Sequence, residues 1–204
     1  MVYDIKPKSL VDIVKFEKGS RIGRKHIREA WNRCGFDPFW ERYYFPWNTP
    51  NWDNLTGFEF NGYNLSPMAR MFGIGQFRKA FFDAGGRKLG YNLFMQQNGV
   101  ENEWVPKEGA NPRGFFEVEF DEGMHPHAMR INYSKGKMGL FHDPLIDYVL
   151  QHPENPDLLV GLAYWSVFGL DLGRAGFFIL EKAGEIPKER MDDVETLNIV
   201  NKYV

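Results

Sequence analysis

Hydrophobic and polar residues alternate along much of the chain after Gly57, a pattern typical of half-buried β-strands. The first example covers residues 57–63, where Phe58 and Phe60 share one face and Glu59 and Asn61 share the other. Similar stretches, separated by turns rich in Gly, Pro, Asn and Asp, follow at 87–96, 114–121, 127–134, 137–141, 157–168 and 174–182. We therefore predict a mainly β protein whose antiparallel strands close into a barrel, with a further strand near Trp104 or after Ile186.

Other parts of the chain favour helices or loops. Ser66 and Pro67 make a good helix start and Gly85 a good stop, so we expect one helix over 67–84, between the first strands. Residues 1–56 are expected to form an extension of N-terminal helices and an aromatic loop. The predicted organisation is this extension, a barrel domain over 57–186, and a tail over 187–204 that could be a terminal helix.

Aromatic residues make up 16% of the chain, with 18 Phe, 9 Tyr and 6 Trp. Two interpretations remain open. The rings either form a core and an apolar surface used for oligomerisation, such as a homodimer, or they line a cavity for a small ligand.

Charge and cysteine content exclude several classes of protein. A formal charge of −2 and the lack of a basic cluster make nucleic acid an unexpected partner. Cys34 is the only cysteine, so no intrachain disulfide can form, and a cytoplasmic location is expected. No apolar run approaches the ~18 residues that span a bilayer, so we expect no membrane partner.

Four stretches also resemble a known family. They are Arg-Ile-Asn-Tyr-Ser-Lys-Gly-Lys at 130–137, Asp-Pro-Leu-Ile-Asp-Tyr at 143–148, Leu-Leu-Val-Gly at 158–161 and Phe-Phe-Ile-Leu-Glu-Lys at 177–182. Together they resemble the C-terminal half of the GXWXG-type lipocalin-like proteins. The resemblance implies a lipocalin-like barrel and a small-ligand role, but it supplies no catalytic residue. Phe60 stands where the family has Trp, and Asp147 aligns with a recurrent acid of the family's Pro-Ile-Ile-Asp turn.

Metal and cofactor signals are weak. His125 and His127 share a face if they lie in a strand, but no third ligand follows at a characteristic spacing. His142 or His152 could ligate a haem, although nothing favours that role over a surface position. We expect neither a metal nor a cofactor.

The strand over 127–134 places Arg130 and Asn132 on one face and Tyr133 on the other. An inward Arg130 would anchor a carboxylate or phenolate, while an outward Arg130 on the barrel wall is slightly favoured. Glu117 and Glu119 lie opposite an apolar stripe, so solvent is their simplest environment. Turned inward, either would have a raised pKa and could act as a general acid or base.

Tyrosines on several predicted strands could bring hydroxyl groups together inside the barrel. His142 adds a possible base, and Asp147 lies one short turn beyond it. The candidate catalytic residues are Arg130, Tyr133, His142 and Asp147. The candidate ligand-binding residues are Phe60, Tyr63, Tyr91, Trp104, Phe116, Asn132 and Tyr164.

These features predict binding of a small apolar or aromatic molecule in the barrel, with possible activity as a cofactor-independent lyase or isomerase. The alternatives are a non-catalytic carrier and a structural or interaction protein with a filled barrel. Two or more inward groups among Arg130, Glu117, Glu119, His142 and Asp147 would favour the enzyme.

Overall fold

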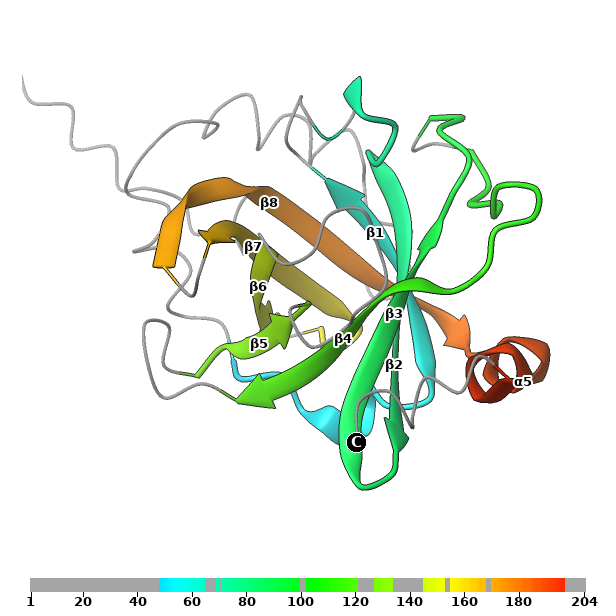
Figure 1. The fold of residues 1–204 in the computed structure, drawn as a ribbon, viewed down its shortest axis with the longest axis horizontal. Coiled ribbons are helices and arrows are strands. Elements are labelled where there is room, and N and C mark those ends of the chain that lie inside the picture. Colours follow the sequence, from blue (N-terminus) through cyan, green and yellow to red (C-terminus); the bar gives the residue numbers. More distant parts are fainter. Residues whose placement is uncertain are drawn as a thin grey trace, which may run out of the picture.

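The structure, a computed structural model, describes residues 48–64, 69, 71–99, 102–120, 127–133, 145–152, 155–167 and 170–196. Within them, eight antiparallel strands form a closed barrel in sequence order, and β1 pairs with β8 to complete it (Figure 1). The strands are β1 Phe58–Asn64, β2 Gln76–Ala84, β3 Arg87–Phe94, β4 Arg113–Phe120, β5 Met129–Asn132, β6 Leu145–Gln151, β7 Leu158–Val167 and β8 Leu170–Glu185. The short 3-10 helix η1 (Trp52–Asn54) precedes the barrel, and helix α5 (Lys188–Thr196) follows it. The predicted barrel is confirmed.

Strands predicted from alternation match β1, β3, β4, β5, β7 and β8. The helix predicted over 67–84 is wrong, because residues 76–84 form β2; helical conformation near it is described at Ala69 and Met71. The predicted stop signal is instead a hairpin turn, in which Gly85 and Gly86 have φ values of 58° and 73°. Both glycines therefore adopt the left-handed conformation that tight two-residue hairpins require.

The turn that the family resemblance implies at Asp147 is a strand in this chain, since β6 begins at Leu145 and includes Asp147. Strands β2 and β6 are buried on both faces, and this removes the hydrophobic alternation that marks a half-buried strand. The strand predicted over 137–141 and the helices predicted in the N-terminal extension lie outside the described residues.

One end of the barrel is closed by apolar packing. Trp52 and Leu55 enter it from the η1 segment, and the Trp52 ring meets Phe81 edge-on at 6.2 Å between centroids. Phe81 also contacts Phe60 and Phe116 at 5.6 and 5.7 Å. The Trp52 Nε1–H donates to the Asp83 carboxylate at 3.0 Å, which fixes η1 against the end of β2. This closed end, where β1 begins, is therefore filled by side chains.

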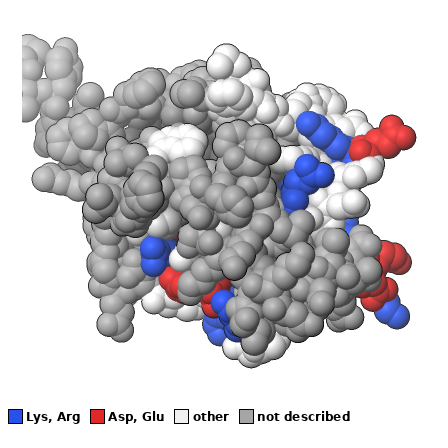
Figure 2. Space-filling model, in the orientation of Figure 1, with Lys and Arg blue, Asp and Glu red and all other residues white. Residues whose placement is uncertain are grey.

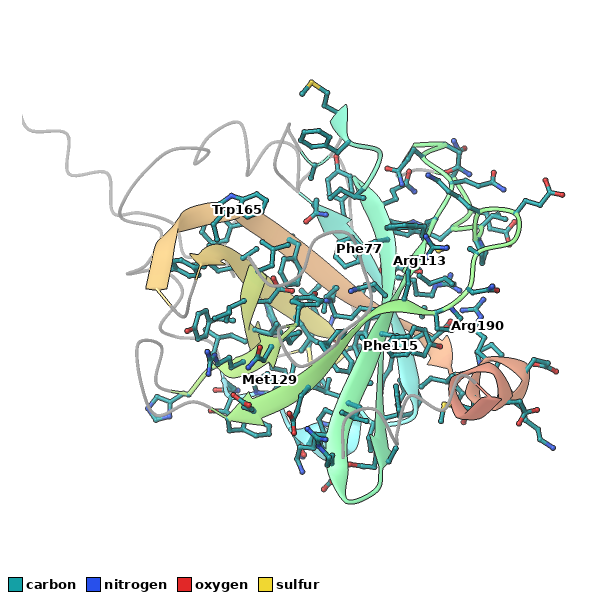
Figure 3. All side chains as sticks on the ribbon, in the orientation of Figure 1. Phe77, Arg113, Phe115, Met129, Trp165 and Arg190 are labelled. Carbon is teal, nitrogen blue, oxygen red and sulfur yellow. The ribbon has the colours of Figure 1, made fainter. Side chains whose placement is uncertain are left out.

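Helix α5 lies on the outside of the barrel (Figure 1). Ile186 and Met191 pack there against a second apolar cluster that includes Phe82, Leu89 and Tyr91. In the tail over 187–204, which could form a terminal helix, the structure describes a helix at Lys188–Thr196. In Figure 3, Phe77 lies among the barrel strands, whereas Arg190 lies outside the barrel on α5.

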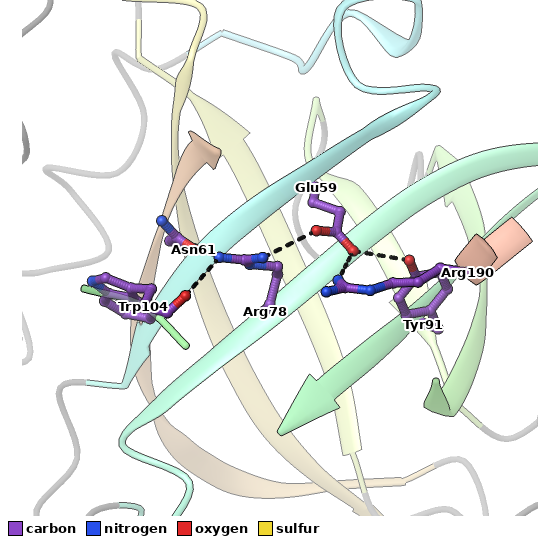
Figure 4. A network of polar contacts seen from close by, with 6 residues as sticks. All are labelled: Glu59, Asn61, Arg78, Tyr91, Trp104 and Arg190. Atoms are coloured by element: carbon purple, nitrogen blue, oxygen red, sulfur yellow. Dashed lines mark hydrogen bonds and ion pairs between the residues drawn. The ribbon is translucent and has the colours of Figure 1, made fainter. Parts of the chain in front are cut away.

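A buried carboxylate joins α5 to the barrel wall. Glu59, 3% exposed, accepts hydrogen bonds from Tyr91 at 3.0 Å, from Arg78 at 3.2 Å and from Arg190 of α5 (Figure 4). Arg78 also donates to the Trp104 carbonyl at 3.1 Å. Burial is the main reason that the pKa of Arg78 is lowered and that of Tyr91 raised. The contacts join strands β1, β2 and β3, helix α5 and the segment at Trp104, which indicates a structural role.

Basic and acidic side chains lie near one another on the described part of the face in Figure 2, where no basic patch is visible. In the described part of the chain, no helix is both long and apolar enough to cross a membrane.

Candidate functional site

Three ionisable side chains meet inside the mostly apolar barrel, and Asn92 of β3 lies on the same inner face within hydrogen-bond reach of Tyr133. Lys79 comes from β2, Asp147 from β6, and Tyr133 directly follows β5. Lys79 pairs across the sheet with Phe60 on β1 and with Asn92 on β3, so it shares the inner face with Phe60. Only 1% of Lys79 and 4% of Asp147 is exposed. The barrel register therefore brings an amine, a phenol and a carboxyl group together away from water.

The three groups form a hydrogen-bonded relay. The Lys79 ammonium donates to the Tyr133 hydroxyl oxygen, and the Tyr133 hydroxyl donates to Asp147 Oδ2 at 2.8 Å. Lys79 Nζ also lies 3.4 Å from the same Asp147 oxygen. Tyr133 thus links the amine to the carboxyl group, and protons can pass between them through its hydroxyl.

Four aromatic rings surround the Lys79 amine, and we call Phe77, Phe116, Tyr133 and Phe178 the aromatic cage. Their centroids lie 4.5 Å from Nζ for Phe116, 5.0 Å for Tyr133 and 5.7 Å for both Phe77 and Phe178. These distances permit cation–π attraction, which is strongest when the cation is removed from water. The cage therefore favours a positive charge at a position where solvation is lost.

Glycines allow the cage rings to pack against the strand backbone. A Cβ added to Gly161 would overlap the Phe178 ring, and one added to Gly62 would overlap Phe77. Gly90 provides the same room for Phe116, and a Cβ there would also meet the Ala80 carbonyl. Since a side chain at any of these positions would displace a ring, the three glycines help to set the width and shape of the site.

Burial perturbs the acid–base properties of all three polar groups. It lowers the pKa of Lys79 from its ordinary value, and attraction to Asp147 opposes that shift. Burial raises the pKa of Asp147, while Lys79 and the Tyr133 hydrogen bond oppose the rise. The pKa of Tyr133 lies well above its ordinary value because of burial and the nearby Asp147 charge. Desolvation thus brings the amine and the carboxyl group towards their neutral forms.

Several residues predicted for the site lie at or near this relay. Tyr133 and Asp147 belong to it, Phe116 forms part of the aromatic cage, and Phe60 lies on the same inner face. Arg130 lies on the outer face, where its Nη1 pairs with Glu119 Oε2 at 3.1 Å. The favoured outward placement of Arg130 is therefore confirmed.

Glu117 and Glu119 also lie on the outer face, as expected. Glu117 accepts from Arg87 at 2.7 Å. His142 lies outside the described residues. The enzyme was to be favoured if two or more of five named polar residues pointed inward. Of the four that the structure describes, only Asp147 lies inside the barrel. Its polar partners there are Lys79 and Tyr133.

The remaining predicted ligand contacts lie on the outside of the barrel. Tyr91 bonds to Glu59 there, and Trp104 packs against the cluster under α5. Tyr164 lies edge-on to Tyr148 at 5.6 Å. The remaining two, Tyr63 and Asn132, have outward-facing positions in the strand register. We expected several tyrosine hydroxyls to come together inside the barrel, but of the four candidate tyrosines only Tyr133 lies there.

Lys79 was not predicted as a site residue. In the helix predicted over 67–84, Lys79 would be an ordinary polar surface residue. One signal could have identified it. A single lysine interrupts the apolar positions Phe77 and Phe81, which share its face when the segment is a strand.

Within the described ranges, no group of three or more His, Cys, Asp or Glu side chains could hold a metal ion. The reactive groups at the site are instead an amine, a phenol and a carboxyl group.

No protein-family model matches the chain, and the searches of curated proteins and solved structures gave no match either. The resemblance to the GXWXG-type lipocalin-like proteins stays a prediction.

Proposed function

We propose that the chain binds a small apolar or aromatic molecule within the barrel and acts on it by acid–base chemistry, as a cofactor-independent lyase or isomerase. One observation carries the proposal: the Lys79–Tyr133–Asp147 relay is buried beside the aromatic cage. Apolar walls with a few convergent polar groups are the usual composition of a small-molecule site.

Stability alone does not account for the relay. Replacing a buried ion pair with apolar side chains of similar volume is often neutral or stabilising. The closed end of this barrel is packed in that way, with Phe60, Phe81 and Leu55 fully buried. Groups whose pKa values are displaced by burial are concentrated at functional sites, and this favours a chemical role for Lys79 and Asp147.

Each polar group has a distinct role in the proposed reaction. Asp147 removes or returns a proton at a carbon next to a carbonyl group, which its raised pKa suits. Tyr133 donates a hydrogen bond to the oxygen on which negative charge develops, and a charged Lys79 stabilises that oxygen. The cage rings hold the apolar part of the molecule. A carrier would need the rings but not the relay.

Exchange of carbon-bound protons tests this chemistry without knowledge of the natural substrate. The full chain would be incubated with benzylacetone in deuterium oxide, and loss of the protons next to the carbonyl would be followed by proton NMR. We expect exchange faster than with buffer alone, and a reduction of about 10²- to 10⁴-fold in Asp147→Asn, the range associated with a positioned acid or base.

Tyr133→Phe should also slow the exchange, whereas Tyr164→Phe is a matched control, because Tyr164 lies outside the barrel beside Tyr148. Equal rates in wild type and Asp147→Asn, with both variants folded by circular dichroism, would overturn the acid–base role. Binding of benzylacetone without any exchange would instead favour the carrier.

A further inference from the structure

We propose that Lys79 forms a covalent imine with its ligand, so that the substrates are aldehydes or ketones bearing an apolar or aromatic group. The inference rests on the proposed function, because it assigns a substrate class to the same site. The juxtaposition of the Lys79 amine, the Tyr133 hydroxyl and the Asp147 carboxyl group inside an apolar barrel carries it.

The first requirement for imine formation is an uncharged amine. Lys79 is 1% exposed, so burial removes the water that would solvate an ammonium ion, an effect that the cage rings oppose only in part. A proton moved from Lys79 to Asp147, directly or through Tyr133, turns the ion pair into an amine and a carboxylic acid. The lowered pKa of Lys79 and the raised pKa of Asp147 both favour this exchange.

The second requirement is a proton donor near the carbonyl oxygen. The Lys79 lone pair attacks the carbonyl carbon, forming a C–N bond, and the oxygen takes a proton from Tyr133. Asp147 restores the Tyr133 proton and accepts one from the attacking nitrogen, leaving a carbinolamine. The C–O bond then breaks, the hydroxyl group leaves as water with the Asp147 proton, and the nitrogen lone pair forms the C=N bond.

The balanced result is one water, a protonated imine and an Asp147 carboxylate. The positive imine then occupies the position of the Lys79 ammonium, where Asp147 and the aromatic cage stabilise it. A protonated imine withdraws electrons from the neighbouring carbon. This makes that carbon easier to deprotonate or cleave, as isomerase and lyase reactions require.

The proposed route to the amine starts at the end of β2 that carries Phe77. Phe77 lies on β2 near that end and, at 8% exposure, is more exposed than Phe116 or Phe178. Its ring packs over Gly62 and meets Phe178 edge-on at 5.9 Å. Phe77→Ala therefore removes the outermost ring of the cage and should speed access to Lys79.

Reductive trapping tests the inference. The full chain would be treated with benzaldehyde and sodium cyanoborohydride, which converts an imine to a stable benzylamine, and the modified lysine would be located by peptide mass spectrometry. At low benzaldehyde concentration and near-neutral pH, we expect Lys79 to be labelled at least about tenfold faster than the other lysines, because burial lowers the pKa of its amine and Tyr133 and Asp147 lie beside it.

Two variants serve as the main controls. Lys79→Arg keeps the positive charge but cannot form an imine, and it should abolish the fast labelling. Lys182→Met removes another lysine that lies over a ring, 3.6 Å from the Phe58 centroid, and it should leave the labelling of Lys79 unchanged. Asp147→Asn leaves a less basic amine but removes the acid that protonates the leaving hydroxyl group, so it should slow labelling when loss of that group limits the rate. Phe77→Ala should accelerate labelling.

The outcomes separate this inference from the proposed function. Labelling of Lys79 no faster than that of the exposed lysines, with benzylacetone exchange still present, would overturn imine formation and leave the acid–base proposal standing. Loss of exchange in a folded Lys79→Arg, together with fast trapping in wild type, would support both. Absence of both reactions in the wild-type chain would overturn both.

Discussion

Replacing Lys79 by Met should destabilise the protein by an amount that grows as the pH rises, whereas Asp147→Asn should have the opposite dependence. In Lys79→Met, Asp147 stays buried without its cation, so its folded-state pKa rises further above the ordinary value of 3.8. The folded state then binds more protons than the unfolded state. The free energy of unfolding should therefore fall as the pH rises from about 4 through that raised pKa.

In Asp147→Asn, Lys79 loses the carboxylate that opposed its desolvation, so its folded-state pKa falls further below 10.5. The unfolded state then binds more protons across the interval between the two values. The free energy of unfolding should accordingly fall as the pH drops from about 10 through the folded-state pKa. Lys79→Met should therefore lose stability as the pH rises, and Asp147→Asn should lose stability as the pH falls.

The coupling between the two residues can be estimated from their geometry. Charges 3.4 Å apart at an effective dielectric constant of about 20 attract by about 5 kcal/mol. Removing one partner of a buried pair costs about 3 to 5 kcal/mol, while replacing both costs little. Lys79→Met with Asp147→Asn should thus be more stable than either single variant at neutral pH.

Urea unfolding followed by tryptophan fluorescence would measure the four proteins of this double-mutant cycle between pH 5 and 9, a range within which both dependences appear. Lys182 and Asp157 provide a matched pair, because their charged atoms lie 3.6 Å apart but Asp157 is 58% exposed. Their coupling should stay below about 1 kcal/mol. Equal coupling in the two pairs, or parallel pH profiles in the two single variants, would refute the reasoning.

Two further predictions concern the cage and the helix. Gly161→Ala should cost about 1 to 3 kcal/mol in urea unfolding, because the new methyl group overlaps the Phe178 ring, and Phe178→Leu should recover part of the loss; an unchanged midpoint would show that the ring is not confined there. Arg190→Met should make α5 more sensitive to limited proteolysis, because it removes the ion pair with Glu59, whereas Lys188→Met should not. Cleavage at the wild-type rate in Arg190→Met would contradict an anchoring role.

The sequence predicts the fold well where only one face of a strand is buried. Alternation locates β1 and β4 within one or two residues, since polar side chains such as Glu59 and Glu117 face away from the barrel interior. It fails for β2, because Ala80 and Phe82 are buried under the outer cluster while Phe81 fills the interior. A strand with two buried faces has no hydrophobic alternation to detect.

The same distinction explains which site residues can be predicted from the sequence. Tyr133 could be predicted because Met129 and Ile131 share its face, and apolar neighbours indicate the inner side of the barrel. The sequence makes Asp147 a candidate, but the family resemblance places it in a turn, whereas it lies on β6. The predicted helix over 67–84 hides Lys79 as a site residue, because a lysine on a helix is usually exposed to solvent. Its partnership with Asp147 depends on how β2 and β6 are placed around the closed barrel, which local pattern does not encode.

The most direct measurement is an NMR titration of the chain, carrying labelled tyrosine and phenylalanine rings, with benzaldehyde and benzylacetone. If ligands bind at the relay, the ring signals of Tyr133, Phe116 and Phe178 should shift together and saturate, while those of Tyr148 and Tyr164 stay in place. Shifts confined to the outer-face tyrosines, or no saturable shift with either compound, would contradict a ligand site inside the barrel.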